Sequence, residues 1–316
     1  MRRVLVLVLI LALLTPGIVS ADYIKWVDFN VSYEALDKAL SLDIRSQEVD
    51  QPVSWIVLLA MAACRTGGKV TAPSVSQAYR DFLTGKSPRE LLGDLSKYYD
   101  YYLEAYTAVL GGLVGNYAIL VEENGEKLWK PQYGLKAFAP VAAGYGFSHC
   151  DDFGVGRTYG FARKHLGHDL MGSLGTPIVA VEGGRVEAMG WNQYGGWRVG
   201  IRSHDSKRYY YYAHLQKDRP FAPGLKEGDT VQAGQVIGFM GRTGYSTKEN
   251  VNNIESVHLH FGIQLIFDES QKECNSEIWI DAYPIVRLLN RHRSSVARQP
   301  DGTWQRVYAY KDLDRE

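Results

Sequence analysis

The spacing of apolar residues divides the chain into two parts with different expected secondary structure. Apolar residues recur at helical spacing in Tyr33–Leu42 and in Trp55–Cys64, and Gly67-Gly68 is expected to end the second helix. The segment Ser87–Glu90 is a capping box with proline at the first helical position, and it predicts a helix that runs to about Leu110. We therefore expect residues 22–115 to form a helical N-terminal domain.

The helix expected after Ser87 carries a dense group of tyrosines. They are Tyr98, Tyr99, Tyr101, Tyr102 and Tyr106. Such a face could stack on sugars, but packing between neighbouring helices is the more common role of such side chains. We favour packing, and we find no catalytic constellation in this part of the chain.

After Val114 the pattern changes to short runs that are typical of strands. Tyr117–Glu123, the dipeptide Asn124-Gly125 and Glu126–Pro131 predict a two-stranded hairpin with a tight primed turn. From about residue 135 short β-rich runs alternate with glycine-rich turns, as in a compact sheet. A final short helix near Tyr283–Arg291 is expected to pack on the outside. The expected divisions are a hairpin and linker at 116–139, a sheet domain at 140–295 and a C-terminal tail at 296–316.

The first 21 residues have the three-part pattern of a secretory signal peptide. Arg2 and Arg3 form a basic start, Val4–Leu14 is an apolar run, and Val19–Ala21 is a small-residue cleavage site. A membrane anchor is the alternative, but a span needs about 20 apolar residues. Pro16-Gly17 interrupts this run. We expect cleavage after Ala21, export, and no later segment that could span a bilayer.

Composition excludes several classes of function. The 316 residues carry 35 Lys+Arg and 35 Asp+Glu, so the chain lacks the basic excess of a nucleic-acid-binding protein. Hydrophobic residues make up 46% and charged residues 22%, which excludes wholesale disorder. Export would permit disulfides, but Cys64, Cys150 and Cys274 are an odd number. Cys150 and Cys274 could pair across the histidine-rich region, or all three could be buried thiols.

All eight histidines lie at or beyond position 149. The eight are His149, His165, His168, His204, His214, His258, His260 and His292. His258 and His260 lie two residues apart in a run with strand character, which places both side chains on one face. His165 and Asp169 lie four apart across a glycine, so they can converge on one point. Imidazole and carboxylate together are a common set of zinc ligands.

A third segment, Tyr209–Leu215, adds another histidine to a strand. Strict alternation would place Tyr210, Tyr212 and His214 on one face of this strand. We expect that face to point away from the core, with His214 turned toward the other histidines. Tyr212 is then a candidate substrate-binding residue.

Together these segments predict a catalytic zinc site. His165, Asp169 and His260 would supply three protein ligands to one Zn²⁺ ion and leave a fourth position for water. Zinc lowers the pKa of a bound water and polarises a carbonyl, which are the requirements for amide hydrolysis. His214 and His258 would then move protons and stabilise the oxyanion as the catalytic pair.

Four blocks of this sequence resemble, in order and in spacing, the LytM/lysostaphin-type zinc endopeptidases, which cut peptide bonds in bacterial peptidoglycan. The blocks are His165–Asp169 with Gly175-Thr176-Pro177, Tyr212–Leu215, Glu227–Gly238 and His258–Phe261. The resemblance covers residues from about 140 to 267 and implies a mainly antiparallel β-sheet with a groove over the zinc. It also implies His165, Asp169 and His260 as zinc ligands and His214 and His258 as the catalytic pair. The predicted fold class is therefore α+β, with a helical domain followed by an antiparallel sheet domain.

Some residues near the expected site depart from the family pattern. His168 stands where the family usually has an apolar residue, and it could compete for metal or form a hydrogen bond. Lys248–Val257 is an insertion that is expected to line the groove, and Gly262 replaces a frequent glutamate. The segment His149–Asp152 could fill the fourth zinc position in a latent form, although a short polar loop is favoured. His204 is expected in a hairpin turn and His292 at a solvated helix end.

The predicted function is that of a secreted zinc metalloendopeptidase of the cell envelope, acting on peptidoglycan peptides. The alternative is a catalytically latent or inactive scaffold or regulator with the same fold. The complete ligand set favours the enzyme. A swinging-arm carrier is excluded, because Met240 is followed by Gly241 and Arg242 rather than by a lysine that could be modified.

Overall fold

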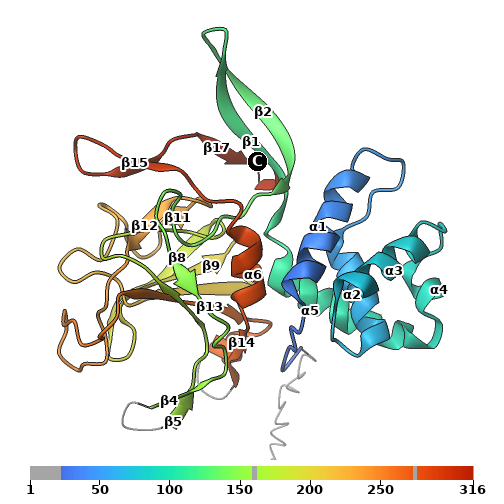
Figure 1. Ribbon diagram of the computed structural model, residues 1–316, viewed down its shortest axis with the longest axis horizontal. Coiled ribbons are helices and arrows are strands. Elements are labelled where there is room, and N and C mark those ends of the chain that lie inside the picture. Colours follow the sequence, from blue (N-terminus) through green and yellow to red (C-terminus); the bar gives the residue numbers. More distant parts are fainter. Residues whose placement is uncertain (1–22, 159–161, 273–275, 316) are drawn as a thin grey trace, which may run out of the picture.

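The computed structural model describes residues 23–158, 162–272 and 276–315 and divides into a helical half and a sheet half (Figure 1). This arrangement confirms the predicted α+β class. The expected signal peptide at 1–21 and Cys274 lie outside the described residues, and Cys64 and Cys150 are free thiols. Among the described helices, none is both long enough and apolar enough to cross a bilayer.

The helical half consists of short helices packed around a common apolar core. They are α1 (Tyr33–Ser46), α2 (Trp55–Thr66), α3 (Ala72–Phe82), α4 (Pro88–Leu92), the 3-10 helix η1 (Gly93–Tyr98) and α5 (Tyr99–Leu110). The Ser32 and Ser54 side chains accept hydrogen bonds from the first turns of α1 and α2, which satisfies backbone donors that have no partner inside a helix. Gly67 ends α2 in the left-handed conformation, with φ 62°, as the sequence predicts.

The prediction of a single helix between Ser87 and Leu110 is wrong in one respect. The capping box forms, but Gly93 adopts φ 54° and ends α4 after five residues, so that η1 separates α4 from α5. Of the tyrosines in this segment, Tyr99 and Tyr106 are buried, as packing predicts, whereas Tyr98 is exposed. Tyr106 is fully buried, and its ring lies edge-on to Phe29 with ring centroids 5.5 Å apart.

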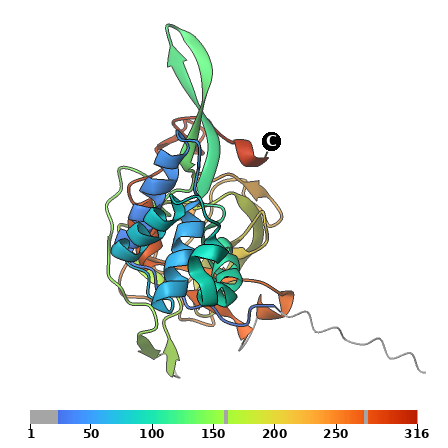
Figure 2. The same cartoon turned by 90° about the vertical axis from the view of Figure 1, so that its right-hand side faces the viewer.

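A long hairpin leads from the helical half into the sheet half and projects from their junction (Figures 1 and 2). Its strands are β1 (Val114–Glu123) and β2 (Glu126–Leu135). Asn124 and Gly125 form the predicted turn, with φ values of 54° and 83°. Within the segment expected as a C-terminal tail, residues 310–312 form β17 (Tyr310–Asp312), which pairs with β1. The Lys136 ammonium fixes this end of the chain by binding the carboxylates of Asp312 and Asp314, each at 2.7 Å.

The largest sheet in the described part of the chain has eight strands and is antiparallel at every pairing. Its order is β11-β8-β9-β10-β13-β6-β3, with β14 beside β13. The bounds are β3 (Ser148–His149), β6 (His168–Met171), β8 (Gly184–Asn192), β9 (Gly196–Ser203), β10 (Arg208–Ala213), β11 (Thr230–Val231), β13 (His258–Leu265) and β14 (Ile278–Ile280). Two-stranded pairs complete the half: β4 (Gly156–Thr158) with β5 (Ala162–Lys164), β7 (Pro177–Val179) with β12 (Val236–Phe239), and β15 (Val296–Arg298) with β16 (Trp304–Arg306).

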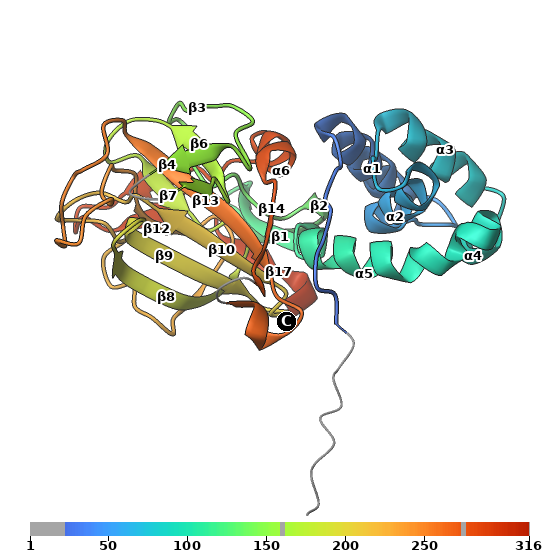
Figure 3. The ribbon, with the colours of Figure 1, turned by 90° about the horizontal axis from the view of Figure 1, so that it is seen from below.

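The last helix, α6 (Tyr283–Leu289), lies between the two halves rather than on the outside as expected (Figure 3). Five of its seven residues are buried, which requires a partner surface on more than one side. The Arg287 guanidinium lies 4.2 Å from the centre of the Tyr33 ring at the start of α1. The helix therefore serves as packing between the helices and the sheet.

A buried arginine joins the two halves at a second place. Arg208, the first residue of β10, is fully buried, and its guanidinium donates to Glu182 at 2.8 Å and to Asp205 at 2.7 Å. It also donates to the carbonyl oxygens of Ala108 at 2.6 Å and Thr107 at 3.3 Å, in the last turn of α5. Carbonyls at the end of a helix lack partners within the helix, so a guanidinium here satisfies them and opposes the negative end of the helix dipole.

We expect Arg208→Met to destabilise the protein by about 3–5 kcal/mol, because it leaves the Glu182 carboxylate buried without its cation. The measurement is the free energy of unfolding in urea. The matched control is Arg89→Met, since Arg89 pairs with Asp100 on the surface and its loss should leave the midpoint unchanged. Equal effects of the two substitutions would contradict a structural role for the Arg208 ion pair.

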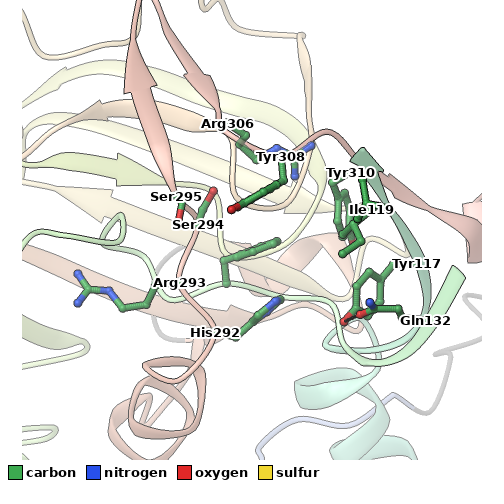
Figure 4. A pocket seen from close by; sticks show the side chains of 12 residues that line it. Tyr117, Ile119, Gln132, His292, Arg293, Ser294, Ser295, Arg306, Tyr308 and Tyr310 are labelled. Carbon is green, nitrogen blue, oxygen red and sulfur yellow. Dashed lines mark hydrogen bonds between the residues drawn. The ribbon is translucent and has the colours of Figure 1, made fainter. Parts of the chain in front are cut away.

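A cavity of about 280 Å³ lies between the hairpin and the C-terminal segment (Figure 4). Tyr117, Gln132, Tyr308 and Tyr310 contribute to its wall. His292 also lines it, stacked on Phe138 with ring centroids 4.3 Å apart and bonded through Nδ1 to the Ala137 carbonyl at 2.7 Å. The expectation that His292 is a solvated helix end is therefore wrong.

Candidate metal centre

Three side chains from separate segments converge on one point. His165 directly follows β5, Asp169 lies in β6, and His260 lies in β13 opposite Asp169 in the strand register. Asp169 Oδ1 is 3.1 Å from both His165 Nε2 and His260 Nδ1, and these two nitrogens are 2.9 Å apart. One ligand atom from each of the three lies within 4.8 Å of the others. The structure thus brings together the three residues that the sequence predicts as metal ligands.

Gly167, between His165 and His168, leaves the space that the imidazole of His260 occupies. A Cβ atom at Gly167 would lie 2.4 Å from His260 Nε2 and 2.5 Å from its Cε1. Any larger residue would therefore displace the imidazole of His260. This contact gives a steric reason for the glycine in the His-Leu-Gly-His-Asp block.

Residues behind the ligands fix which ring nitrogen faces the site. His165 Nδ1 lies 3.1 Å from the carbonyl oxygen of Asp152 and 3.1 Å from its carboxylate Oδ2. Because these oxygens accept, Nδ1 carries the proton and Nε2 offers its lone pair to the centre. Arg157 donates to Asp152 at 2.6 Å and to Asp169 Oδ2 at 3.2 Å, so one guanidinium holds both carboxylates.

The predicted catalytic pair lies beside these ligands. His214 Nδ1 donates to the Thr243 carbonyl at 2.9 Å, and His258 Nδ1 donates to the Ser256 carbonyl at 3.0 Å. With Nδ1 as the donor, Nε2 is in each ring the atom left to face the cavity, and that of His258 is 3.8 Å from Asp169 Oδ1. The rings of His214 and His258 have centroids 4.8 Å apart. Both line a cavity of about 300 Å³ together with the three ligand candidates, which we call the histidine cavity.

The expected role of Tyr212 is wrong. Strand β10 ends at Ala213, and His214 has φ 62°, so the backbone turns and the alternation stops before His214. Tyr212 is fully buried, and its hydroxyl accepts a hydrogen bond from the Val181 amide at 2.9 Å. Tyr211, from the opposite face, lines the histidine cavity and lies edge-on to His260 with centroids 5.9 Å apart.

Several residues of the histidine cavity were missed by the sequence analysis. They are Arg157, Arg163, Tyr194, Tyr211 and Tyr245. Tyr211 lies on the cavity face because Ala213 pairs with His260 and residues two apart on a strand share a face, a register that the sequence alone does not reveal. The expected contribution of the insertion is confined to Ile254, which lines the cavity.

The remaining histidines lie outside the ligand set. His168 is fully buried, and its Nε2 lies 2.7 Å from His149 Nδ1, so it forms a hydrogen bond rather than joining the three ligand candidates. In the segment proposed to fill a fourth position, His149 is thus bonded to His168 and Asp152 lies behind His165. His204 lies in the turn between β9 and β10, as expected.

Burial and mutual contacts shift the pKa values of these groups. Burial alone would raise the pKa of Asp169, but its contacts with the His165 and His260 rings outweigh burial and hold the pKa well below its usual range. Burial lowers the pKa of His214 well below the ordinary value, and His258 and His260 lower it further. Burial likewise lowers the pKa of His260, although Asp169 opposes the shift. At neutral pH Asp169 is therefore a carboxylate, and His214 and His260 are neutral imidazoles. For the ligand candidates Asp169 and His260 these are the forms that metal binding requires.

The donor set fits a divalent metal ion. The carboxylate oxygen of Asp169 and the Nε2 lone pair of His165 point at each other and at His260 Nδ1. Acceptor atoms this close repel one another unless a cation or a proton lies among them. Two imidazole nitrogens and a carboxylate oxygen are the ligand types of catalytic zinc sites with three protein ligands.

Comparison with known proteins agrees with this geometry. Residues 163–274 match the profile of Peptidase family M23. The L-Ala--D-Glu endopeptidase of Bacillus subtilis (strain 168) is 35% identical over 153 residues, which are 48% of this chain and 44% of that protein. Lysostaphin of Staphylococcus simulans is 39% identical over 98 residues, 31% of this chain and 17% of that protein. The chain spans less than half the length of these curated relatives.

A solved structure extends the likeness beyond the matched range. A crystal structure from Ruminococcus gnavus, assigned as a glycyl-glycine endopeptidase lytM, superposes with a TM-score of 0.52 and 25% identity. It covers 85% of this chain and 91% of the other, so the similarity is not confined to residues 163–274. The fold and the candidate site are therefore similar to those of metallopeptidases. Residues 163–274 of this chain are a Peptidase family M23 domain.

We expect Asp152→Ala to weaken zinc binding by roughly 10- to 100-fold, because it removes the carboxylate that holds His165 in the ligating tautomer. Competition with a chromogenic chelator measures the affinity. Asp151→Ala is the matched control, since Asp151 is exposed and, within the described part of the chain, forms no hydrogen bond or ion pair with His165. An unchanged affinity in Asp152→Ala would contradict the orienting role.

We also expect the metal-free protein to lose stability as the pH falls below 6.5. Burial and His149 lower the pKa of His168 to about 3, from an ordinary value of 6.5. Between these values the unfolded chain binds more protons than the folded one, so stability rises with pH through this window by up to about 1.4 kcal/mol per pH unit for this proton. His214 and His260 act in the same direction, and His165, whose pKa is raised despite burial by its bond to Asp169, acts in the opposite one.

The measurement is the urea midpoint at pH 4, 5, 6 and 7 in the presence of chelator. His168→Asn should make the dependence on pH shallower, whatever it does to the stability at pH 7. His204→Asn, in the exposed turn, should keep the dependence of the parent protein. A slope that is the same in all three proteins would show that His168 does not titrate on unfolding.

Proposed function

We propose that this protein is a secreted zinc metalloendopeptidase that hydrolyses peptide bonds in bacterial peptidoglycan. The observation that carries the proposal is the histidine cavity, where the ligand set His165, Asp169 and His260 lies beside two histidines with free Nε2 atoms. A structural metal site would have no need of the second pair. Three protein ligands also leave a coordination position for a reactant.

The chain's own residues account for the proton transfers. A zinc ion bound here would supply a Lewis acid that acidifies water and polarises the scissile carbonyl. Of His214 and His258, one accepts the proton that water loses on attack, and the resulting imidazolium delivers it to the leaving amine. The Thr243 and Ser256 carbonyls hold both rings with Nε2 toward the cavity. Burial keeps His214 neutral at pH 7 by lowering its pKa, so that it is ready to accept a proton.

The substrate and the place of action are proposed from the relatives. The Bacillus subtilis relative is named for an L-Ala--D-Glu bond, and a Staphylococcus capitis relative that is 38% identical over 99 residues is a glycyl-glycine endopeptidase. The Vibrio cholerae relative ShyC, 31% identical over 158 residues, is named a peptidoglycan DD-endopeptidase. Peptides of this polymer lie outside the cytoplasm, which agrees with the signal peptide expected at residues 1–21. We take residues 140–295 as the peptidase domain, because they contain every residue that lines the histidine cavity.

We expect His260→Ala to abolish both zinc binding and hydrolysis, whereas His214→Ala should retain zinc and lose roughly 10²- to 10⁴-fold in rate. The substrate is purified peptidoglycan, and the measurement is mass spectrometry of the released fragments. New free amino termini identify hydrolysis of a peptide bond and the position of that bond. His204→Ala, in an exposed turn, should behave as the parent protein does.

Two results would count against the proposal. Hydrolysis by zinc-free His260→Ala would remove the metal from the mechanism. Absence of fragments from protein that demonstrably holds zinc would instead favour the alternative of a catalytically inactive scaffold or regulator.

A further inference from the structure

Two arginines from one short hairpin stand in the wall of the histidine cavity. Arg157 lies in β4 and Arg163 in β5, and these strands pair with each other. Both line the same cavity as His214, His258 and His260. Neither supplies a metal ligand, and neither takes part in the proton transfers described above. Positive charges at the place where a peptide would lie must be balanced by negative groups of the protein or of a ligand.

Arg157 already has its partners. It donates to the Asp152 carboxylate at 2.6 Å and to Asp169 Oδ2 at 3.2 Å. These contacts tie the ligand Asp169 to the carboxylate behind His165. Arg157 is therefore a positioning residue for the metal centre, and its charge is largely matched by protein groups.

Arg163 is held differently, by neutral aromatic side chains. Its guanidinium carbon lies 5.2 Å from the ring centre of Tyr245 and 6.0 Å from that of Tyr194, and Nη2 donates to the Tyr245 hydroxyl. Its Nε atom is buried and has no hydrogen-bond partner within the described part of the chain. No carboxylate of the described residues lies within ion-pair distance of it, whereas Arg157 has two. Arg163 is thus a fixed cation whose counter-charge the described protein does not supply.

The position of Arg163 places it beside the reacting groups. The Tyr245 ring that carries its guanidinium also contacts His214, with ring centroids 5.8 Å apart. Asp169 is the one carboxylate among the residues that line the cavity, and it belongs to the candidate metal site. A substrate anion that enters next to His214 would therefore meet an unpaired guanidinium and no competing carboxylate.

We propose that Arg163 binds a carboxylate of the substrate on the residue that supplies the nitrogen of the scissile bond. This inference rests on the proposed endopeptidase function and names its substrate class. In a γ-linked glutamyl residue the free α-carboxylate is attached to the same carbon as the scissile nitrogen, so its oxygens lie only about 3 Å from that nitrogen. A guanidinium close to the catalytic histidines matches this geometry, and a charge-assisted hydrogen bond would orient the peptide. A glycine bridge offers no anion at that position.

The test compares three peptides with the zinc-loaded full-length protein. They are L-Ala-γ-D-Glu-L-Lys, the same peptide with the glutamyl α-carboxylate converted to an amide, and pentaglycine. We expect kcat/KM for the free acid to exceed that for the amide by roughly 10- to 100-fold, which is the range for a hydrogen bond to a charged group. Calorimetric titration with the product γ-D-Glu-L-Lys measures binding without hydrolysis.

Three variants separate recognition from structure. Arg163→Met should lose the preference for the free acid while the rate on the amide changes little, and Arg163→Lys should keep part of the preference. Lys164→Met is the matched control, because Lys164 lies in the same strand but outside the cavity wall, and it should retain the full preference. A purely structural role for Arg163 would instead lower the rates on acid and amide alike.

The outcomes distinguish this inference from the function on which it rests. Release of fragments from whole peptidoglycan, with equal rates on acid and amide peptides, would overturn the role of Arg163 and leave the endopeptidase intact. Binding of the free-acid product that depends on Arg163, without hydrolysis of any peptide, would support the carboxylate site and refute the endopeptidase. Neither binding nor hydrolysis would refute both.

Discussion

The strand register of β13 is the constraint on which the site depends. This strand supplies His258 and His260, and it lies between β6, which carries Asp169, and β10, which ends one residue before His214. Because side chains alternate along a strand, a slip of one residue would turn both histidines to the other face of the sheet. Close contacts oppose such a slip. A Cβ at Gly167 would strike the His260 ring, and one at Gly262 would lie 2.7 Å from Trp279.

Strand β10, which pairs with β13, links the register of β13 to the helical half. Arg208 stands at one end of β10 and is held by Glu182 and by the last carbonyls of α5, while the other end of β10 leads directly into His214. A buried ion pair of this kind tolerates little displacement, since movement would leave a charge without its partner in a medium of low polarity. The helices therefore help to fix the strand that positions a catalytic candidate, although none of their side chains lines the histidine cavity.

Local signals in the sequence were sufficient for much of this structure. The capping box, the Asn124-Gly125 turn and the glycine stop at Gly67 act within a few residues, and each forms where it is expected. His165, Asp169 and His260 could be grouped because their local spacing, four residues across a glycine and two residues along a strand, brings side chains that can bind metal together. The errors concern long-range pairing. Tyr212 was preferred to Tyr211 because the register of β10 with β13 and the backbone turn at His214 are not encoded nearby. Likewise, nothing local indicates that residues 310–312 pair with a strand almost two hundred positions earlier.

That last pairing has a consequence for how the chain acquires its structure. Strand β17 closes the sheet of the hairpin, and the Asp314 carboxylate receives hydrogen bonds from both the backbone and the side chain of Asn116. These contacts join residues 310–314 to the first strand after the helices, so they cannot form until the whole sheet half between them has been synthesised. The junction between the halves is thus completed later than the strands that carry the candidate metal centre. A chain cut before residue 310 would keep every residue of the candidate metal centre and still lack the strand that closes the seam between helices and sheet.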